Sequence, residues 1–189
     1  MAATVKTPSE TTAETQSSPA WNPNASAYHF GSFHITTAAL VIGCQSFILG
    51  FSYFLYHSVI AFHLADFGVP TAKVLQYMSG SFFLFIFLLV AVTCLLKALA
   101  ATAAPYAIPF ILYHCYEVSS WCVKLALVDF QMPLLVHIPF LVSGVWGQVL
   151  GWLAGLGVLG LHLLAVHLGI RLYRFLRDQA QATKPVTIV

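Results

Sequence analysis

The residue of this sequence best placed to do chemistry is Glu117, a carboxylate inside the apolar stretch 105–128. A carboxylate exposed to lipid is strongly disfavoured, so Glu117 is expected to face other helices or a polar cavity. It lies 12 residues beyond Pro105, which is roughly 18 Å along a helix. Two interpretations follow: a hydrogen bond to a neighbouring helix, or a role in binding a lipid headgroup or relaying protons.

Lys124 follows Glu117 by seven residues and lies on nearly the same helix face. The rise between the two is about 10 Å, which is too long for a direct salt bridge. The lysine is expected instead to extend its ammonium group to the non-cytosolic interface. Together with Tyr113, these residues are the predicted contacts for a lipid or a protein partner.

Two of the eight histidines could act together. His114 lies about 13 Å inside one predicted helix, and His162 lies about 12 Å from the cytosolic end of another. Similar depth on different helices is what bis-histidine ligation of haem requires. A small haem-binding electron carrier is therefore an alternative function. We favour a polar contact within a helix interface, and we expect no cofactor and no metal site.

Glycines at Gly147, Gly151 and Gly155 recur every four residues in the last apolar stretch. Small residues at this spacing form a groove on one helix face, so that another helix can approach closely. The pattern predicts a helix-packing face. It is compatible with packing inside the chain, with a homodimer and with a contact to another membrane protein.

Two short signals lie near the carboxyl end. Tyr173 and Leu176 fit a tyrosine-based sorting signal that cytosolic adaptors bind, although aromatic residues are also common at membrane interfaces. Thr187 and Val189 fit a terminal-carboxylate ligand for a PDZ domain. Both are hypotheses about cytosolic partners.

No catalytic residue is assigned, and the chain is expected not to be an enzyme. The sequence contains no nucleophile elbow, no zinc-hydrolase motif and no phosphate-binding glycine loop. All four cysteines fall in apolar runs without a CxxC pair, which is typical of small apolar core residues. A net charge of +2 without a cluster of basic and aromatic residues argues against nucleic-acid binding.

The elements that position these residues are expected to be membrane helices. The chain is 59% hydrophobic and 7% charged, whereas soluble domains carry about 25% charged residues. A membrane helix needs about 20 predominantly apolar residues. The predicted fold is an all-α integral membrane protein, a four-transmembrane-helix bundle. The predicted spans cover residues 35–56, 74–96, 105–128 and 147–170.

The apolar tract 130–170 is long enough for two spans, which leaves a five-helix alternative. Pro133 and Pro139 disfavour a regular helix in its first part. Residues 130–146 are therefore expected to lie at the membrane surface or to re-enter the membrane.

Basic residues set the orientation through the positive-inside rule. Arg171, Arg174, Arg177 and Lys184 follow the last span, and Lys97 lies in the turn between the second and third spans. Both ends are therefore predicted to be cytosolic.

The tails complete the predicted domain organisation. Residues 1–32 read as a disordered cytosolic tail, 33–175 as the helical domain and 176–189 as a short cytosolic tail. The glycosylation sequon at Asn24 should stay unmodified on the cytosolic side. In the turn before the third span, Thr102 is expected to cap the helix that Pro105 begins.

Several segments resemble the lysosomal-associated four-transmembrane family. The third span begins with an Ile-Pro-Phe run, followed by a tyrosine and an acidic residue at the family's spacing; the matching positions are Ile108, Pro109, Phe110, Tyr113 and Glu117. The entry to the first span, 33–43, and the exit from the fourth, 173–177, are also similar to the family's. Uncharacterised nematode relatives of that family look closer still.

The resemblance implies a four-span protein of late endosomes and lysosomes with both termini cytosolic. Such proteins act as adaptors or regulators in the trafficking of membrane proteins and in transporter handling, and some associate with membrane lipids. The expected partners are membrane lipids, other membrane proteins and cytosolic sorting adaptors. The family's Pro-Pro-x-Tyr motifs are not present in this chain, so a ubiquitin-ligase partner is not carried over. A channel or transporter accessory subunit is a further alternative.

Overall fold

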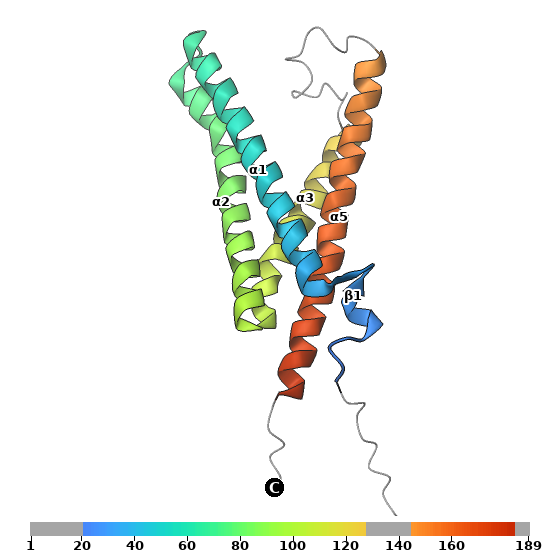
Figure 1. Cartoon of the computed structure of the whole chain (residues 1–189). Helices are drawn as coiled ribbons and strands as arrows, with labels where there is room; N and C mark the ends of the chain where they lie inside the picture. Colours follow the sequence, from blue (N-terminus) through green and yellow to red (C-terminus); the bar gives the residue numbers. More distant parts are fainter. Residues whose placement is uncertain (1–20, 128–144, 184–189) are drawn as a thin grey trace, which may run out of the picture.

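Long helices dominate the structure, a computed structural model that describes residues 21–127 and 145–183 (Figure 1). The all-α class is therefore confirmed, apart from one small hairpin. The chain forms η1 (Ser26–Tyr28), β1 (His29–Phe30), β2 (Phe33–His34), α1 (Ile35–Asp66), α2 (Thr71–Ala101), η2 (Ala104–Ala107), α3 (Ile108–Leu127) and α5 (Val145–Ala182).

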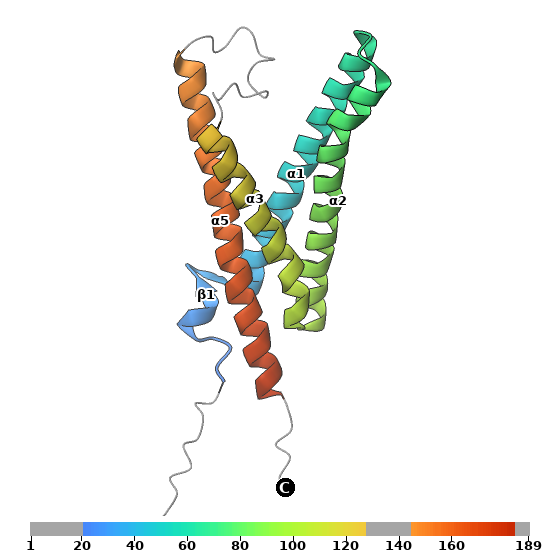
Figure 2. The ribbon, with the colours of Figure 1, turned by 180° about the vertical axis from the view of Figure 1, so that it is seen from behind.

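Among the described residues, three helical segments are long and apolar enough to cross a membrane: Ile35–Asp66, Thr71–Ala101 and Trp152–Ala182. Several helices of this kind indicate a multi-pass membrane protein. The remaining helix, α3, has 20 residues and contains Glu117 and Lys124. It packs against α5 and α2 (Figure 2).

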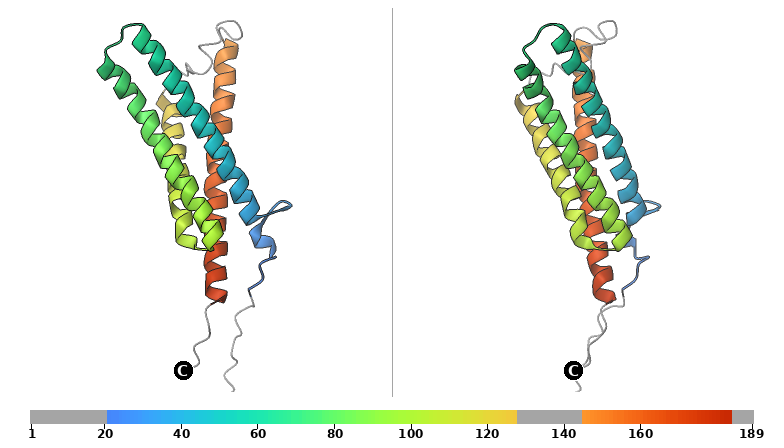
Figure 3. Two further views of the ribbon diagram at one scale, coloured as in Figure 1. Left: turned by 60° about the vertical axis from the view of Figure 1, so that its left-hand side comes forward. Right: turned by 90° about the vertical axis from the view of Figure 1, so that its left-hand side faces the viewer.

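The helices alternate in direction, so the α1–α2 turn and the α2–α3 turn lie at opposite ends of the bundle (Figures 1 and 3). The described start of the chain, the turn between α2 and α3, and the end of α5 all lie at one end. The α1–α2 pair and the α3–α5 pair lie close together at this end. The two pairs diverge toward the other end in Figures 1 and 2.

The first two helices extend beyond the predicted spans. α1 ends at Asp66 rather than near residue 56, and α2 begins at Thr71. Hydropathy marks the part of a helix that lies in lipid, whereas the helix ends where the backbone is capped. Gly68 supplies that stop with φ +76°, and Val69 N–H donates to Leu64 C=O.

The turn between α2 and α3 differs from the prediction for Thr102. This residue adopts a left-handed conformation, φ 47°, and closes α2 instead of capping the next helix. Pro105 lies in the first turn of η2, as expected for a proline at a helix start. Lys97 lies over the ring of Tyr106, with Nζ 4.3 Å from the ring centroid, which links α2 to η2.

The main core lies at the end of the bundle that holds the chain's described start, and small residues bring its helices close. Its members are Ile35, Ala38, Ala39, Ile42, Leu95, Ala98, Ala104, Ala107, Phe110, Ala165, Leu168, Leu172, Phe175 and Leu176. A second cluster of Leu88, Ala91 and Tyr113 continues it along the bundle.

Three glycines mark the closest helix contacts. A Cβ atom at Gly43 would lie 2.6 Å from Leu95 Cδ2, and one at Gly50 would overlap Leu88. A Cβ at Gly169 would lie 2.8 Å from Ile111 Cγ1. The predicted packing face consists of Gly147, Gly151 and Gly155. Gly155 is buried in α5, and the structure does not describe the surroundings of the other two.

The predicted disorder of the N-terminal tail is wrong for residues 21–32, the part that the structure describes. Residues 21–32 form η1 and the hairpin and pack on the bundle, so the part of the tail after residue 20 is folded. The final helix continues to Ala182, past the predicted boundary at residue 175. The predictions for 1–20, for 130–144 and for Thr187 and Val189 lie outside the described residues.

Candidate functional site

His114 and His162, which the sequence places at similar depth on two helices, are in contact in the structure. Their Nδ1 atoms lie 2.8 Å apart, which is a hydrogen bond between α3 and α5. His114 Nε2 lies 3.3 Å from the hydroxyl of Ser46 on α1, and that hydroxyl donates to Ile42 C=O at 2.7 Å. We call Ser46, His114 and His162 the histidine clamp, because they join three helices.

When both rings are neutral, donation by the Ser46 hydroxyl to Ile42 C=O leads to one assignment of the ring hydrogens. The Ser46 hydroxyl gives its hydrogen to Ile42 C=O, so its oxygen accepts from His114 Nε2–H. The other nitrogen of a neutral ring is an acceptor, so His114 Nδ1 accepts from His162 Nδ1–H. The hydrogen bonds therefore run in one direction, from α5 through α3 to α1.

Burial makes this clamp important for packing. His114 is 1% exposed, and its ring packs on Phe110 and Tyr113 with centroids 4.5 and 5.0 Å away. A buried ring nitrogen without a partner is destabilising by about 1–3 kcal/mol. Each nitrogen of His114 has a partner on another helix, so the clamp orients α3 relative to both α1 and α5.

The same geometry does not fit haem ligation. Two axial nitrogens must lie on opposite sides of one metal, each at about 2 Å, so they would be about 4 Å apart. The Nδ1 atoms are 2.8 Å apart and face each other directly. A porphyrin has no place between rings in this contact.

Glu117 lies on the same face of α3 as His114, because residues three apart are neighbours on a helix. It is 7% exposed, as the cost of a lipid-exposed carboxylate requires. Tyr53 of α1 and Tyr113 of α3 lie near it. We call Glu117, Tyr53 and Tyr113 the acidic interior site.

A further group of polar rings lies between α1 and α2. The ring centroid of His57 lies 4.2 Å from that of Tyr53 and 5.2 Å from that of Tyr77. Tyr53 therefore belongs both to this group and to the acidic interior site. The polar groups of α1, α2 and α3 form a series of neighbours that runs from buried Glu117 to exposed Tyr53.

The predicted contact residues differ in how accessible they are. Glu117 and Tyr113 are buried, so a lipid or partner would reach them only by entering between helices. Lys124 lies on α3, but its side chain is outside the description. Leu176 is 1% exposed and Tyr173 packs against the core, so this sorting signal is held in a helix rather than presented as an extended segment.

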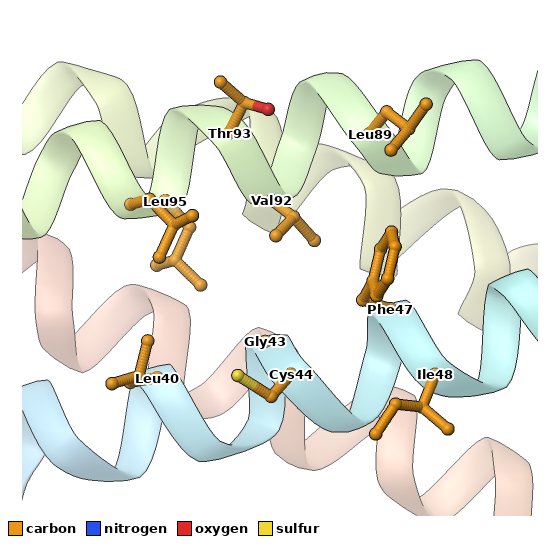
Figure 4. Close-up of a pocket in the computed structure, with 10 residues that line it drawn as sticks. Leu40, Gly43, Cys44, Phe47, Ile48, Leu89, Val92, Thr93 and Leu95 are labelled. Carbon is orange, nitrogen blue, oxygen red and sulfur yellow. The ribbon is translucent and has the colours of Figure 1, made fainter.

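An apolar groove lies on the outer side of α1 and α2, with α3 and α5 passing behind it (Figure 4). Its volume is about 470 Å³. We call it the outer groove; it is lined by Leu40, Gly43, Cys44, Phe47, Ile48, Leu89, Val92, Thr93, Leu95 and Leu96. Because its walls belong to membrane-type helices, the hydrocarbon of the bilayer is its natural surroundings.

Sequence reasoning missed Ser46, Tyr53 and the outer groove. A signal for Ser46 exists in the small residues of α1, because Ala39, Gly43, Ser46 and Gly50 recur at intervals of four, three and four. That spacing places them on one helix face. Within residues 21–127 and 145–183, no group of three or more His, Cys, Asp or Glu side chains could hold a metal ion.

No protein-family model, no curated protein and no solved structure matches the chain. The resemblance to the lysosomal-associated four-transmembrane family therefore stays a prediction.

Breaking the histidine clamp should lower stability. We expect His114→Ala and His162→Ala each to destabilise the protein by about 2–4 kcal/mol, through a cavity and an unpaired ring nitrogen. The double variant should fall short of the sum by roughly 1–2 kcal/mol, because the first change already removes the shared bond. Thermal unfolding of the detergent-solubilised protein measures both.

The matched control is His167→Ala, since His167 is an exposed histidine of the same helix. It should change stability little. Additive effects in the double variant would show that the two rings do not interact.

Proposed function

We propose that this chain is a non-enzymatic, four-span membrane protein of late endosomes and lysosomes. In this proposal it acts as an adaptor or regulator in membrane-protein trafficking or lipid handling. Both termini face the cytosol, and the partners are membrane lipids or other membrane proteins, with a second copy of the chain as one possible partner.

The observation that carries the proposal is the outer groove. Its lining is apolar except for the Thr93 hydroxyl and the Cys44 thiol, and it opens beside exposed side chains such as Ile48. Concave apolar surfaces of this size are typical of ligand sites. In a bilayer, the available ligands are acyl chains and the helices of neighbouring proteins.

The arrangement of α3 supports the four-span part of the proposal. A helix of 20 residues is about 30 Å long, which matches the hydrocarbon core of a bilayer. Its one carboxylate, Glu117, is turned into the bundle. Four crossings also agree with the described start of the chain and the end of α5 lying at the same end of the bundle (Figure 1).

Localisation and topology can be measured together. A fluorescent tag at each end should give a punctate signal that overlaps with endolysosomal markers, and both tags should be destroyed by protease in permeabilised cells. The sequon at Asn24 should stay unglycosylated, because cytosolic segments do not meet the transferase. A plasma-membrane or mitochondrial signal, or one protected tag, would contradict the proposal.

Filling the outer groove should weaken binding. Cys44 is exposed and lines the groove, so Cys44→Trp should occupy it with little effect on the core. We expect crosslinking to photoactivatable phospholipid or to a co-purifying membrane protein to fall on the order of tenfold, equivalent to about 1.4 kcal/mol.

The control is Cys115→Trp, since Cys115 is an exposed cysteine of α3 away from the groove. This variant should crosslink like the unchanged protein. Equal loss in both variants would point to a general effect of the added indole, and no loss in either would remove the groove from the proposal.

A channel or transporter accessory subunit is a second candidate, because polar side chains from several helices meet inside the bundle. The histidine clamp joins α1, α3 and α5, and the acidic interior site joins α1 and α3. Titratable residues that meet in a membrane interior often mark ion pathways or proton relays.

Proton flux in proteoliposomes distinguishes this candidate. If the acidic interior site carries protons, Glu117→Gln should abolish flux, since the amide has a similar shape and cannot exchange the proton. Asp66→Asn, at the exposed end of α1, should keep it. Flux no greater than that of empty vesicles would exclude the candidate and leave the adaptor proposal intact.

A further inference from the structure

The segment between residue 21 and α1 folds onto the end of the bundle that holds the end of α5 (Figure 1). We call residues 21–34 the N-terminal strap. It contains no Asp, Glu, Lys or Arg, and its aromatic residues are Trp21, Tyr28, Phe30 and Phe33. Aromatic residues without charge are typical of segments at a membrane interface.

Contacts with α5 hold the base of the strap in place. Arg171 donates to the carbonyl groups of Ala27 and His29, the latter at 2.9 Å. The Tyr28 hydroxyl donates to Asp178 Oδ2 at 2.9 Å, and its ring packs edge-on against Phe175. Burial and the Asp178 carboxylate raise the pKa of Tyr28, so the phenol keeps the hydrogen that it donates.

The hairpin of β1 and β2 has two faces. His29 pairs with His34 and Phe30 pairs with Phe33, and successive side chains of a strand point to opposite faces. His34 packs against Phe175, with ring centroids 5.0 Å apart. The histidine face is therefore turned toward α5, and the phenylalanine face is turned away from the bundle.

The phenylalanine face is exposed in the structure. Phe30 is 38% and Phe33 is 58% exposed. Gly31, with φ +60°, makes the tight turn between them. Two exposed rings on a tip whose base is held by Arg171 would be stabilised by an apolar environment outside the chain.

The position of the hairpin identifies that environment. Its last residue, His34, caps the first helix by accepting from Thr36 N–H, so β2 leads directly into a membrane-type helix. Figure 1 shows the hairpin extending sideways from the bundle at the level where α1 begins. Arg171, Arg174 and Arg177 on α5 lie at this end of the chain and suit a surface of anionic headgroups.

We propose that the N-terminal strap is a lipid-binding element, with Phe30 and Phe33 inserted at the boundary between the headgroups and acyl chains of the adjacent leaflet. The occupant of this face is phospholipid of the membrane that the helices cross. The depth is interfacial, because the free backbone N–H and C=O groups of a two-stranded hairpin require water or headgroups as partners. The inference goes beyond the proposed function and depends only on the chain being a membrane protein.

A photocrosslinking residue at position 33 tests this. The full chain with p-benzoylphenylalanine at position 33 is reconstituted in vesicles of phosphatidylcholine and phosphatidylserine, with the phosphatidylcholine radiolabelled. Two reference positions calibrate the result. At position 48 the crosslinker should attach to lipid, because Ile48 is 63% exposed and lies roughly 20 Å along α1 from Ile35. At position 181 it should give little lipid adduct, because Gln181 is exposed and lies about 15 Å beyond Arg171 on α5, in the direction of water.

We expect labelled lipid to attach at position 33 with a yield close to that at position 48 and well above that at position 181. A yield equal to that at position 181 would place the tip in water and overturn the proposal. A crosslinked dimer in place of the lipid adduct would also overturn it, by assigning the face to a second copy of the chain. These outcomes do not depend on localisation, on the outer groove or on proton flux.

Discussion

Hydrocarbon supplies no hydrogen-bond partners, and this constraint explains how the interior of the bundle is arranged. Each buried polar group must find a partner on another helix or on its own backbone. The histidine clamp satisfies both nitrogens of His114 by using one neighbour from α1 and one from α5. Since these bonds are directional, they specify how far each helix is shifted along its neighbours, which apolar contacts alone specify poorly.

Close approach of the helices is the second requirement, because an imidazole reaches only a short distance from its backbone. Gly43 and Gly50 bring α1 against α2, and Gly169 brings α5 against α3. The alanines of the core do the same at the end of the bundle where the chain's described start lies. Small residues therefore allow the helices to come into contact, and polar residues determine how the helices are aligned along one another. Glu117 is buried within the frame that they form.

The helices could be predicted from apolar runs, and the similar depth of His114 and His162 from their positions in two of those runs. Their direct contact could not, because depth does not say which helix faces meet. Helix ends were harder to predict, because Gly68 and Thr102 stop helices by backbone conformation, which hydropathy does not register. The glycine spacing drew attention to residues 147–155, whereas Gly43 and Gly50 stand seven residues apart among larger neighbours. The strap was missed for a related reason. Its Ser, Asn and Pro residues are typical of disorder. The bond of Tyr28 to Asp178 and that of Arg171 to His29 join positions 150 and 142 residues apart, which the local sequence does not reveal.

The last helix is continuous from Val145 to Ala182, which is about 57 Å of unbroken backbone. A bilayer core covers roughly 30 Å of that length. The helix extends well beyond that layer, and its outer end and its buried part belong to one unbroken run of backbone hydrogen bonds. A force applied near Asp178 would therefore be transmitted to His162, sixteen residues away inside the bundle, and would strain the bond that holds α3 in register.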